Sequence, residues 1–115
     1  DGFSCWAVEE RETGLIVGEV GLQPFDREGP EIELAYAFGS AYWSRGFATE
    51  AARAVLAEGF GERGLDRIVA VTRDENTASR RVLEKLGFVR AGRRTAWGHD
   101  QPFFVLEAAR YDASR

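Results

Sequence analysis

The sequence predicts a mixed α/β domain in which a single central sheet carries helices on its faces. Three observations predict this class. Short strand-like segments fill the N-terminal third, two amphipathic helical segments follow, and a nearly all-apolar run lies between those helices. The chain has 115 residues, the length of one ordinary domain, so we expect one domain over residues 1–115.

The first two strands form a predicted hairpin. From Cys5 to Glu10, successive side chains alternate between the two faces of an expected strand. A turn follows at residues 12–14, and a return strand covers residues 15–22. The glycines of the return strand, Gly18 and Gly21, indicate a bulge or a place where another backbone comes close.

A third strand is expected over residues 31–38, after a polar loop over residues 24–30. Its alternation places Glu31 and Glu33 on one side of the strand and Tyr36 on the other.

A long helix is predicted from about Gly46 to Glu62, because apolar residues recur there at three- and four-residue steps. The apolar run over residues 68–72 has the pattern of a strand buried on both faces. A helix connects this strand to the strand over residues 31–38, so the two strands are expected to be parallel.

A second helix is predicted over residues 77–86, with Asn76 as its N-cap and Gly87 just after its end. Two closing strands are expected over residues 88–94 and 103–109, joined by a polar loop over residues 95–102 that holds Trp97 and His99.

The composition narrows the function classes. The formal net charge is −4, an acidic balance that argues against nucleic acid as the main partner. No apolar run approaches the ~18 residues of a membrane span, so no membrane partner is expected. Cys5 is the one cysteine and cannot form an internal disulfide, which favours a cytoplasmic location. One histidine and one cysteine do not supply a usual zinc site, so no metal is expected.

The segment that joins the third strand to the long helix carries the most information about ligands. It reads YWSRGFATE over residues 42–50. Gly46 and Ala48 leave the amides of the first helical turn uncovered, and those amides attract an anion together with the helix dipole. Thr49 adds a hydroxyl and Arg45 a positive charge. The segment fits a pyrophosphate cradle, and an ordinary helix start is the alternative.

A second glycine-rich segment, GFGERG over residues 59–64, matches the dinucleotide fingerprint G-x-G-x-x-G. That motif needs a strand before it and a helix after it, whereas this segment ends a helix and leads into a strand. We therefore interpret these glycines as a helix stop and exclude a nicotinamide dinucleotide site.

Four polar side chains, in or next to two of the expected strands, are candidates for a catalytic or ligand-binding role. Asn76 and Ser79 lie one helical turn apart, just past the strand over residues 68–72, where open α/β sheets bind ligands. Both could instead only cap the helix. Glu31 and Glu33 either supply a general base or are solvent-facing strand residues.

Together these segments resemble the GCN5-related N-acetyltransferase (GNAT) superfamily, in particular its ribosomal-protein alanine and serine acetyltransferases. The residues that carry the resemblance read ELAY over residues 33–36, YWSRGFATEA over 42–51, NTAS over 76–79 and VLEKLGF over 82–88. The motifs stand in the family's order on the elements predicted for them, and the resemblance extends from about Trp6 to Ala109.

The resemblance implies acetyl-CoA as co-substrate, and a mostly antiparallel sheet with one splayed parallel strand pair. Trp43 takes the Gln or Arg position of the family's pyrophosphate loop, and small residues follow it. The backbone of the third strand would pair with the pantetheine arm, which would also contact an asparagine side chain. The cofactor-binding residues implied are Ala37, Phe38, Trp43, Ser44, Arg45, Gly46, Phe47, Ala48, Thr49 and Asn76.

The resemblance also implies catalytic roles. Many family members carry a tyrosine seven residues after the asparagine, as the acid for the leaving thiolate, and Leu83 stands at that position here. Ser79 is therefore the expected acid, and Glu33 is the expected base for a primary amine on a small molecule or a peptide. The amine would attack acetyl-CoA directly in a ternary complex. A non-catalytic CoA-binding or regulatory module on the same fold is the alternative.

The chain begins at Asp1 and contains no methionine, so we expect a preceding segment to be missing. By the family's pattern, the missing segment would consist of a strand and one or two helices. It would have roughly 50 residues, at about 11 residues per helix and 5 per strand plus loops. A partner chain could cover the sheet edge left open, and a homodimer is one such assembly.

Overall fold

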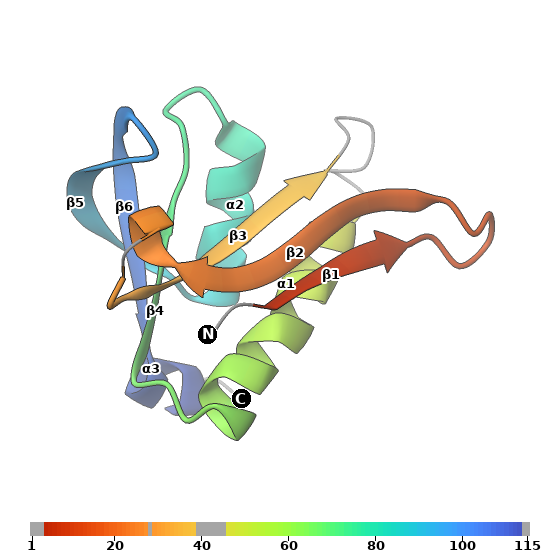
Figure 1. The fold of residues 1–115 in the computed structure, drawn as a ribbon, viewed down its shortest axis with the longest axis horizontal. Coiled ribbons are helices and arrows are strands. Elements are labelled where there is room, and N and C mark those ends of the chain that lie inside the picture. Colours follow the sequence, from red (N-terminus) through yellow and green to blue (C-terminus); the bar gives the residue numbers. More distant parts are fainter. Residues whose placement is uncertain (1–3, 28, 39–45, 114–115) are drawn as a thin grey trace.

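The computed structural model describes residues 4–27, 29–38 and 46–113, and it has the expected mixed α/β architecture (Figure 1). The strands are β1 Ser4–Glu9, β2 Ile16–Pro24, β3 Ile32–Phe38, β4 Arg67–Val71, β5 Val89–Ala96 and β6 His99–Glu107. The helices are α1 Phe47–Ala57, α2 Thr77–Leu86 and α3 Ala108–Ala113.

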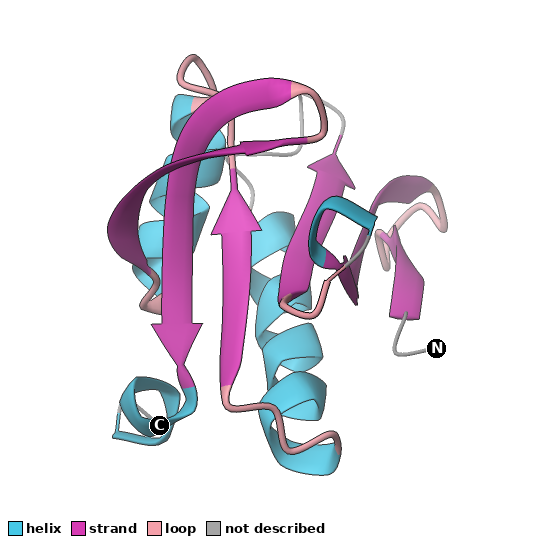
Figure 2. Cartoon of the chain, turned by 60° about the vertical axis from the view of Figure 1, so that its left-hand side comes forward, coloured by secondary structure: helices cyan, strands magenta, loops and turns pink. Residues whose placement is uncertain are grey.

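The six strands form one sheet in the order β1-β2-β3-β4-β6-β5. All neighbouring pairs are antiparallel except β3 and β4, which are parallel as predicted. Among the described residues these two strands share a single bridge, between Glu33 and Val69, and beyond it they diverge toward their C-terminal ends (Figures 1 and 2). The splayed parallel pair is therefore confirmed.

Both long helices cover one face of the sheet (Figure 2). α1 begins after Gly46 and continues through a π-helical turn at Glu58–Glu62, which matches the predicted long helix. The glycine-rich segment over residues 59–64 therefore ends a helix and leads toward β4, as interpreted from the sequence. α2 has Asn76 as its N-cap and Gly87 as its C-cap, the latter in the left-handed conformation at φ 99°.

The main core lies between these helices and the sheet. Its most deeply buried large side chains come from both layers and are Leu22, Leu56, Ile68, Leu83 and Leu106. A smaller apolar cluster of Phe25, Val69, Ala96 and Phe103 lies on the opposite face. The strand β4 contributes to both clusters, which confirms that it is buried on both faces.

Gly18 in β2 marks a close approach, as its place in a strand predicts. A Cβ built there would lie 2.5 Å from the backbone oxygen of Ala37 and 2.5 Å from the ring of Phe38. The β1–β2 register also shifts next to this position, between Val8 and Glu9. Any side chain at Gly18 would therefore push the end of β3 away.

The prediction of a polar loop over residues 95–102 is wrong. β5 and β6 continue through this segment and meet at a two-residue turn, in which Trp97 has φ 56° and Gly98 has φ 81°. Polar residues misled the prediction. Thr95, His99 and Asp100 are exposed near the end of the hairpin, whereas Gln101 is buried and donates to the backbone oxygen of Ala96 at 2.8 Å, so polar residues occupy both strands.

Two further boundaries differ from the prediction. The last strand was expected to reach Ala109, but β6 ends at Glu107 and α3 begins at Ala108, where Arg110 Nε donates to the backbone oxygen of Gly87 at 2.7 Å. The loop expected over residues 24–30 includes a 3-10 turn at Phe25–Arg27, whose phenylalanine is buried. In the part of the chain that the structure describes, no helix is long and apolar enough to cross a membrane.

Candidate active site

A cavity of about 350 Å³ lies where β3 and β4 diverge. Its lining comes from β3, β4, the start of α2 and the β5–β6 hairpin, and includes Glu33, Tyr36, Asn76, Ser79, Trp97 and His99. Because it occupies the gap between two strands, side chains from both faces of the sheet reach it. Three predicted site residues, Glu33, Asn76 and Ser79, therefore line one cavity although they are up to 46 positions apart in the printed sequence (79 minus 33).

Glu33 is buried, with 4% of its surface exposed, so the alternative of a solvent-facing strand residue is wrong. Trp97 Nε1 donates to its Oε1 at 2.9 Å, and Gln23 Nε2 donates to the same oxygen at 3.4 Å. Burial raises the pKa of Glu33 to about 7, partly opposed by these two hydrogen bonds and aided by the nearby charge of Asp26. Such a carboxyl changes protonation near neutral pH.

Trp97 holds the hairpin turn against β3. Besides its indole contact with Glu33, its backbone N–H donates to Asp26 Oδ1 at 2.8 Å, and the Arg27 guanidinium lies 5.6 Å from its ring centroid. Trp97 was not a predicted site residue, because residues 95–102 were expected to form a loop. The one sequence feature that pointed to this residue is a large aromatic side chain within a polar segment.

The start of α2 brings Asn76 and Ser79 together. Asn76 Oδ1 accepts from the backbone N–H of Ser79 at 3.0 Å, so the capping role is confirmed. The Ser79 side chain is buried and lies 3.0 Å, oxygen to oxygen, from the Tyr36 hydroxyl. Sequence reasoning missed Tyr36, although its alternation placed it on the strand side opposite Glu33, the side that faces α2.

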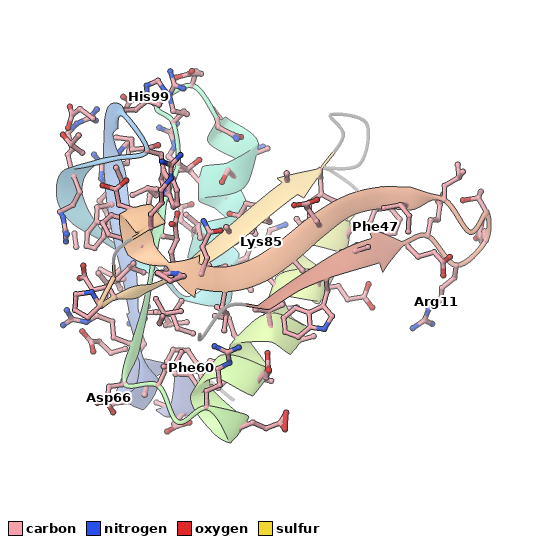
Figure 3. All side chains as sticks on the ribbon, viewed as in Figure 1. Arg11, Phe47, Phe60, Asp66, Lys85 and His99 are labelled. Atoms are coloured by element: carbon pink, nitrogen blue, oxygen red, sulfur yellow. The ribbon has the colours of Figure 1, made fainter. Side chains whose placement is uncertain are left out.

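Charged side chains around the β4–α2 loop are paired with side chains of the β5–β6 hairpin. Arg93 on β5 donates two hydrogen bonds to the Asp74 carboxylate, each at 2.9 Å, and a third to Asp100 at 3.1 Å. Arg73 Nη1 lies 3.3 Å from His99 Nε2, near the tip of the hairpin (Figure 3). These contacts connect the β4–α2 loop to the hairpin and so fix the outline of the cavity.

The predicted anion site lies at the N-terminus of α1. Gly46 has φ 83°, and its position gives the helix no side-chain cap. Among the described residues, no atom lies within 4 Å of a Cβ built there, so glycine is favoured by the backbone conformation rather than by close packing. Ala48 is fully buried and Thr49 half-buried in the first turn. Their N–H groups lie in the turn that lacks helical acceptors.

The remaining predicted cofactor residues are distributed as follows. Ala37 is exposed and Phe38 half-buried at the C-terminal end of β3, next to the cavity lining. Phe47 lines a separate groove of about 830 Å³ between β1 and α1. Trp43, Ser44 and Arg45 lie outside the described residues.

Comparisons with known proteins give the family. Residues 1–89 match the family model described as an acetyltransferase (GNAT) domain. An uncharacterized N-acetyltransferase of Bacillus subtilis, YnaD, is 43% identical over 114 residues, which cover 93% of this chain and 66% of YnaD. The chain spans about half to two thirds of the length of the curated relatives that it matches.

Solved structures agree with the model of the fold. A GNAT-family acetyltransferase from Bacillus anthracis superposes with a TM-score of 0.76 at 28% identity, covering 91% of this chain and 66% of the other. A ribosomal-protein-S5-alanine acetyltransferase from Vibrio fischeri superposes with a TM-score of 0.76, at 24% identity, over 93% of this chain and 62% of the other, and shows the likeness of fold. The expected resemblance is confirmed, and the chain belongs to the GNAT family of acetyltransferases.

Proposed function

We propose that this protein transfers an acetyl group from acetyl-CoA to a primary amine by direct attack of the amine on the thioester. The observation that carries this proposal is the cavity between the diverging strands β3 and β4, which holds Glu33 and Ser79 together. A donor and an acceptor can meet there because the gap opens on both faces of the sheet.

Glu33 is the proposed general base. A free alkyl ammonium titrates near ~10, so at neutral pH the amine must lose a proton before it can attack. A carboxyl with a pKa of about 7 is a stronger base than an ordinary glutamate and is still ionised in part at neutral pH. Both hydrogen bonds to Glu33 use Oε1, and we assign the proton from the amine to Oε2.

The helix N-terminus at Gly46 is the proposed site for the pyrophosphate of acetyl-CoA. Three features fit such a group: a backbone bend without a side chain, no contact from the described residues to a Cβ built at Gly46, and first-turn amides with no cap from the Gly46 side. By the family resemblance we add Trp43, Ser44, Arg45, Phe47, Ala48 and Thr49 to this loop. Ala37, Phe38 and Asn76 would hold the pantetheine arm along the diverging edge of β3.

Ser79 is the proposed acid for the leaving thiolate. As the C–N bond forms and the C–S bond breaks, the electron pair of the C–S bond goes to sulfur, which takes the Ser79 proton. The proton lost from the new amide nitrogen restores the serine hydroxyl. Glu33 releases the first amine proton to solvent, so each group returns to its starting state. A strand N–H near the cavity is proposed to hold the developing oxyanion.

Two measurements test this function. A thermal shift with CoA and with acetyl-CoA tests the cradle: both should raise the melting temperature, and no shift with either would refute the site. Thiol release from acetyl-CoA is then measured across a panel of amines that includes polyamines, amino acids and peptides with free N-termini. Release with at least one amine supports the enzyme. Binding without release by any amine would instead support the non-catalytic CoA-binding module.

A further inference from the structure

We propose that Tyr36 is a positioning residue for Ser79: the hydrogen bond between the two hydroxyls holds Ser79 Oγ in the rotamer that lines the cavity. This inference rests on the proposed acetyl transfer, in which Ser79 must present a proton to sulfur. It gives a role to a residue of β3 that the family resemblance includes in ELAY over residues 33–36 without assigning it a function.

The contact between the two side chains is close and well enclosed. The Tyr36 hydroxyl lies 3.0 Å from Ser79 Oγ and 3.2 Å from the backbone oxygen of Ser79. Ser79 is 3% exposed, and the Tyr36 ring packs against the main core between β3 and α2. Both side chains also line the cavity. A hydroxyl pair held in this way has few alternative arrangements.

The contact holds the serine oxygen whichever hydroxyl donates. The Tyr36 hydroxyl donates to the backbone oxygen of Ser79 at 3.2 Å, and either hydroxyl can donate in the contact with Ser79 Oγ. In both directions the contact fixes where Ser79 Oγ lies. Burial raises the pKa of Tyr36 to about 12, so the hydroxyl keeps its proton at any working pH.

Without this contact, Ser79 has a competing arrangement. A serine in a helix often donates its hydroxyl hydrogen to a backbone carbonyl of the preceding turn, three or four residues earlier. That rotamer would give up the contact with the Tyr36 hydroxyl. Tyr36 therefore selects the rotamer that the transfer needs, and it keeps its own proton throughout the reaction.

The position of Leu83 strengthens this assignment. Leu83 stands where many family members have the acidic tyrosine, and here it is 1% exposed within the main core. A tyrosine hydroxyl reaches the start of α2 all the same, but from β3 instead of from the helix. In this proposal the serine carries the proton and the tyrosine holds the serine oxygen in place.

The test compares Tyr36→Phe, Ser79→Ala and the double variant, with Tyr111→Phe as the matched control. Tyr111 stacks on Phe60, with ring centroids 4.6 Å apart, and does not line the cavity. For each variant we measure kcat, the KM for acetyl-CoA, the affinity for CoA and the melting temperature, using the best amine from the panel.

We expect Tyr36→Phe to lower kcat by about tenfold or more, a fraction of the 10²–10⁴ that general acid catalysis contributes. The KM for acetyl-CoA and the CoA affinity should stay within about twofold, since neither depends on the serine rotamer. In the Ser79→Ala background, Tyr36→Phe should lower kcat by less than about twofold, because its effect runs through the missing hydroxyl. Tyr111→Phe should keep kcat within about twofold of the wild type.

Two outcomes would overturn the inference while leaving the proposed function standing. One is an unchanged kcat in Tyr36→Phe, and the other is a loss that multiplies with that of Ser79→Ala. If Tyr36→Phe melts near the assay temperature, the comparison is repeated in the cold, where the same criteria apply. No thiol release by the wild type with any amine refutes the proposed function itself, and the positioning role falls with it.

Discussion

Replacing Glu33 with glutamine should stabilise the protein, and the gain should grow with pH. The pKa of Glu33 rises from its usual 4.5 to about 7 because burial disfavours the charged form. Each step of one in pKa corresponds to about 1.4 kcal/mol, so ionising this carboxyl in the folded protein costs about 3 kcal/mol more than in the unfolded chain. A group with a raised folded pKa contributes stability below its unfolded pKa and loses it as pH rises through the folded pKa. That loss falls between about pH 4.5 and pH 7 for Glu33.

Urea unfolding followed by tryptophan fluorescence at a series of pH values measures this effect. We expect the difference in unfolding free energy between Glu33→Gln and the wild type to rise by up to about 3 kcal/mol across that pH range and then level off. Taking the difference cancels the groups that both proteins share. Glu84→Gln, on an exposed position of α2, corrects for the Glu-to-Gln change itself. A difference that stays flat from acid to neutral pH would refute the raised pKa, and with it the case for Glu33 as a base near neutrality.

Three further changes test other parts of the site. Gly46→Asp should abolish the thermal shift with CoA, because it places a carboxylate beside the proposed pyrophosphate. Gly46→Ala should keep that shift while losing about 1–2 kcal/mol of stability to the left-handed backbone, and equal binding by both variants would contradict the anion site. Ser79→Ala should lower kcat by about 10²-fold with little change in KM, and normal turnover would remove it from the catalytic residues. Trp97→Phe removes a hydrogen bond that lowers the pKa of Glu33. In the pH profile of kcat/KM, the limb that lies near neutral pH should therefore move to higher pH. A limb that stays in place would contradict that contact.

Much of the fold could be predicted because its signals are local. The ends of α2 are an example: Asn76 and Gly87 are an N-cap and a C-cap in the sequence and in the structure. The apolar run of β4 likewise predicted a strand buried on both faces, because no exposed position interrupts it. The parallel pairing of β3 with β4 then followed from the helix between them.

The contacts inside the cavity could not be predicted in the same way. Trp97 and Glu33 are 64 residues apart, and Tyr36 and Ser79 are 43 residues apart. Each pair is brought together by the sheet order, in which β3 and β4 are neighbours and the β5–β6 hairpin folds back toward them. The alternation of β3 gave the correct face for Glu33 and for Tyr36. A local pattern does not indicate which side chain of another element contacts either residue.

Two locally unfavourable features of the described residues are in contact with each other, and this bears on the site. One is the buried carboxylate of Glu33, and the other is Trp97, a bulky residue held at φ 56° in a tight turn that favours asparagine and glycine. The Trp97 indole lowers the pKa of Glu33, while Glu33 and Asp26 both hold Trp97 in its turn. An arrangement with a neutral residue at position 33 would be more stable above pH 7. The proposed proton transfer accounts for a carboxyl at this place in the cavity, because a raised pKa makes Glu33 a stronger base for the amine than an ordinary glutamate.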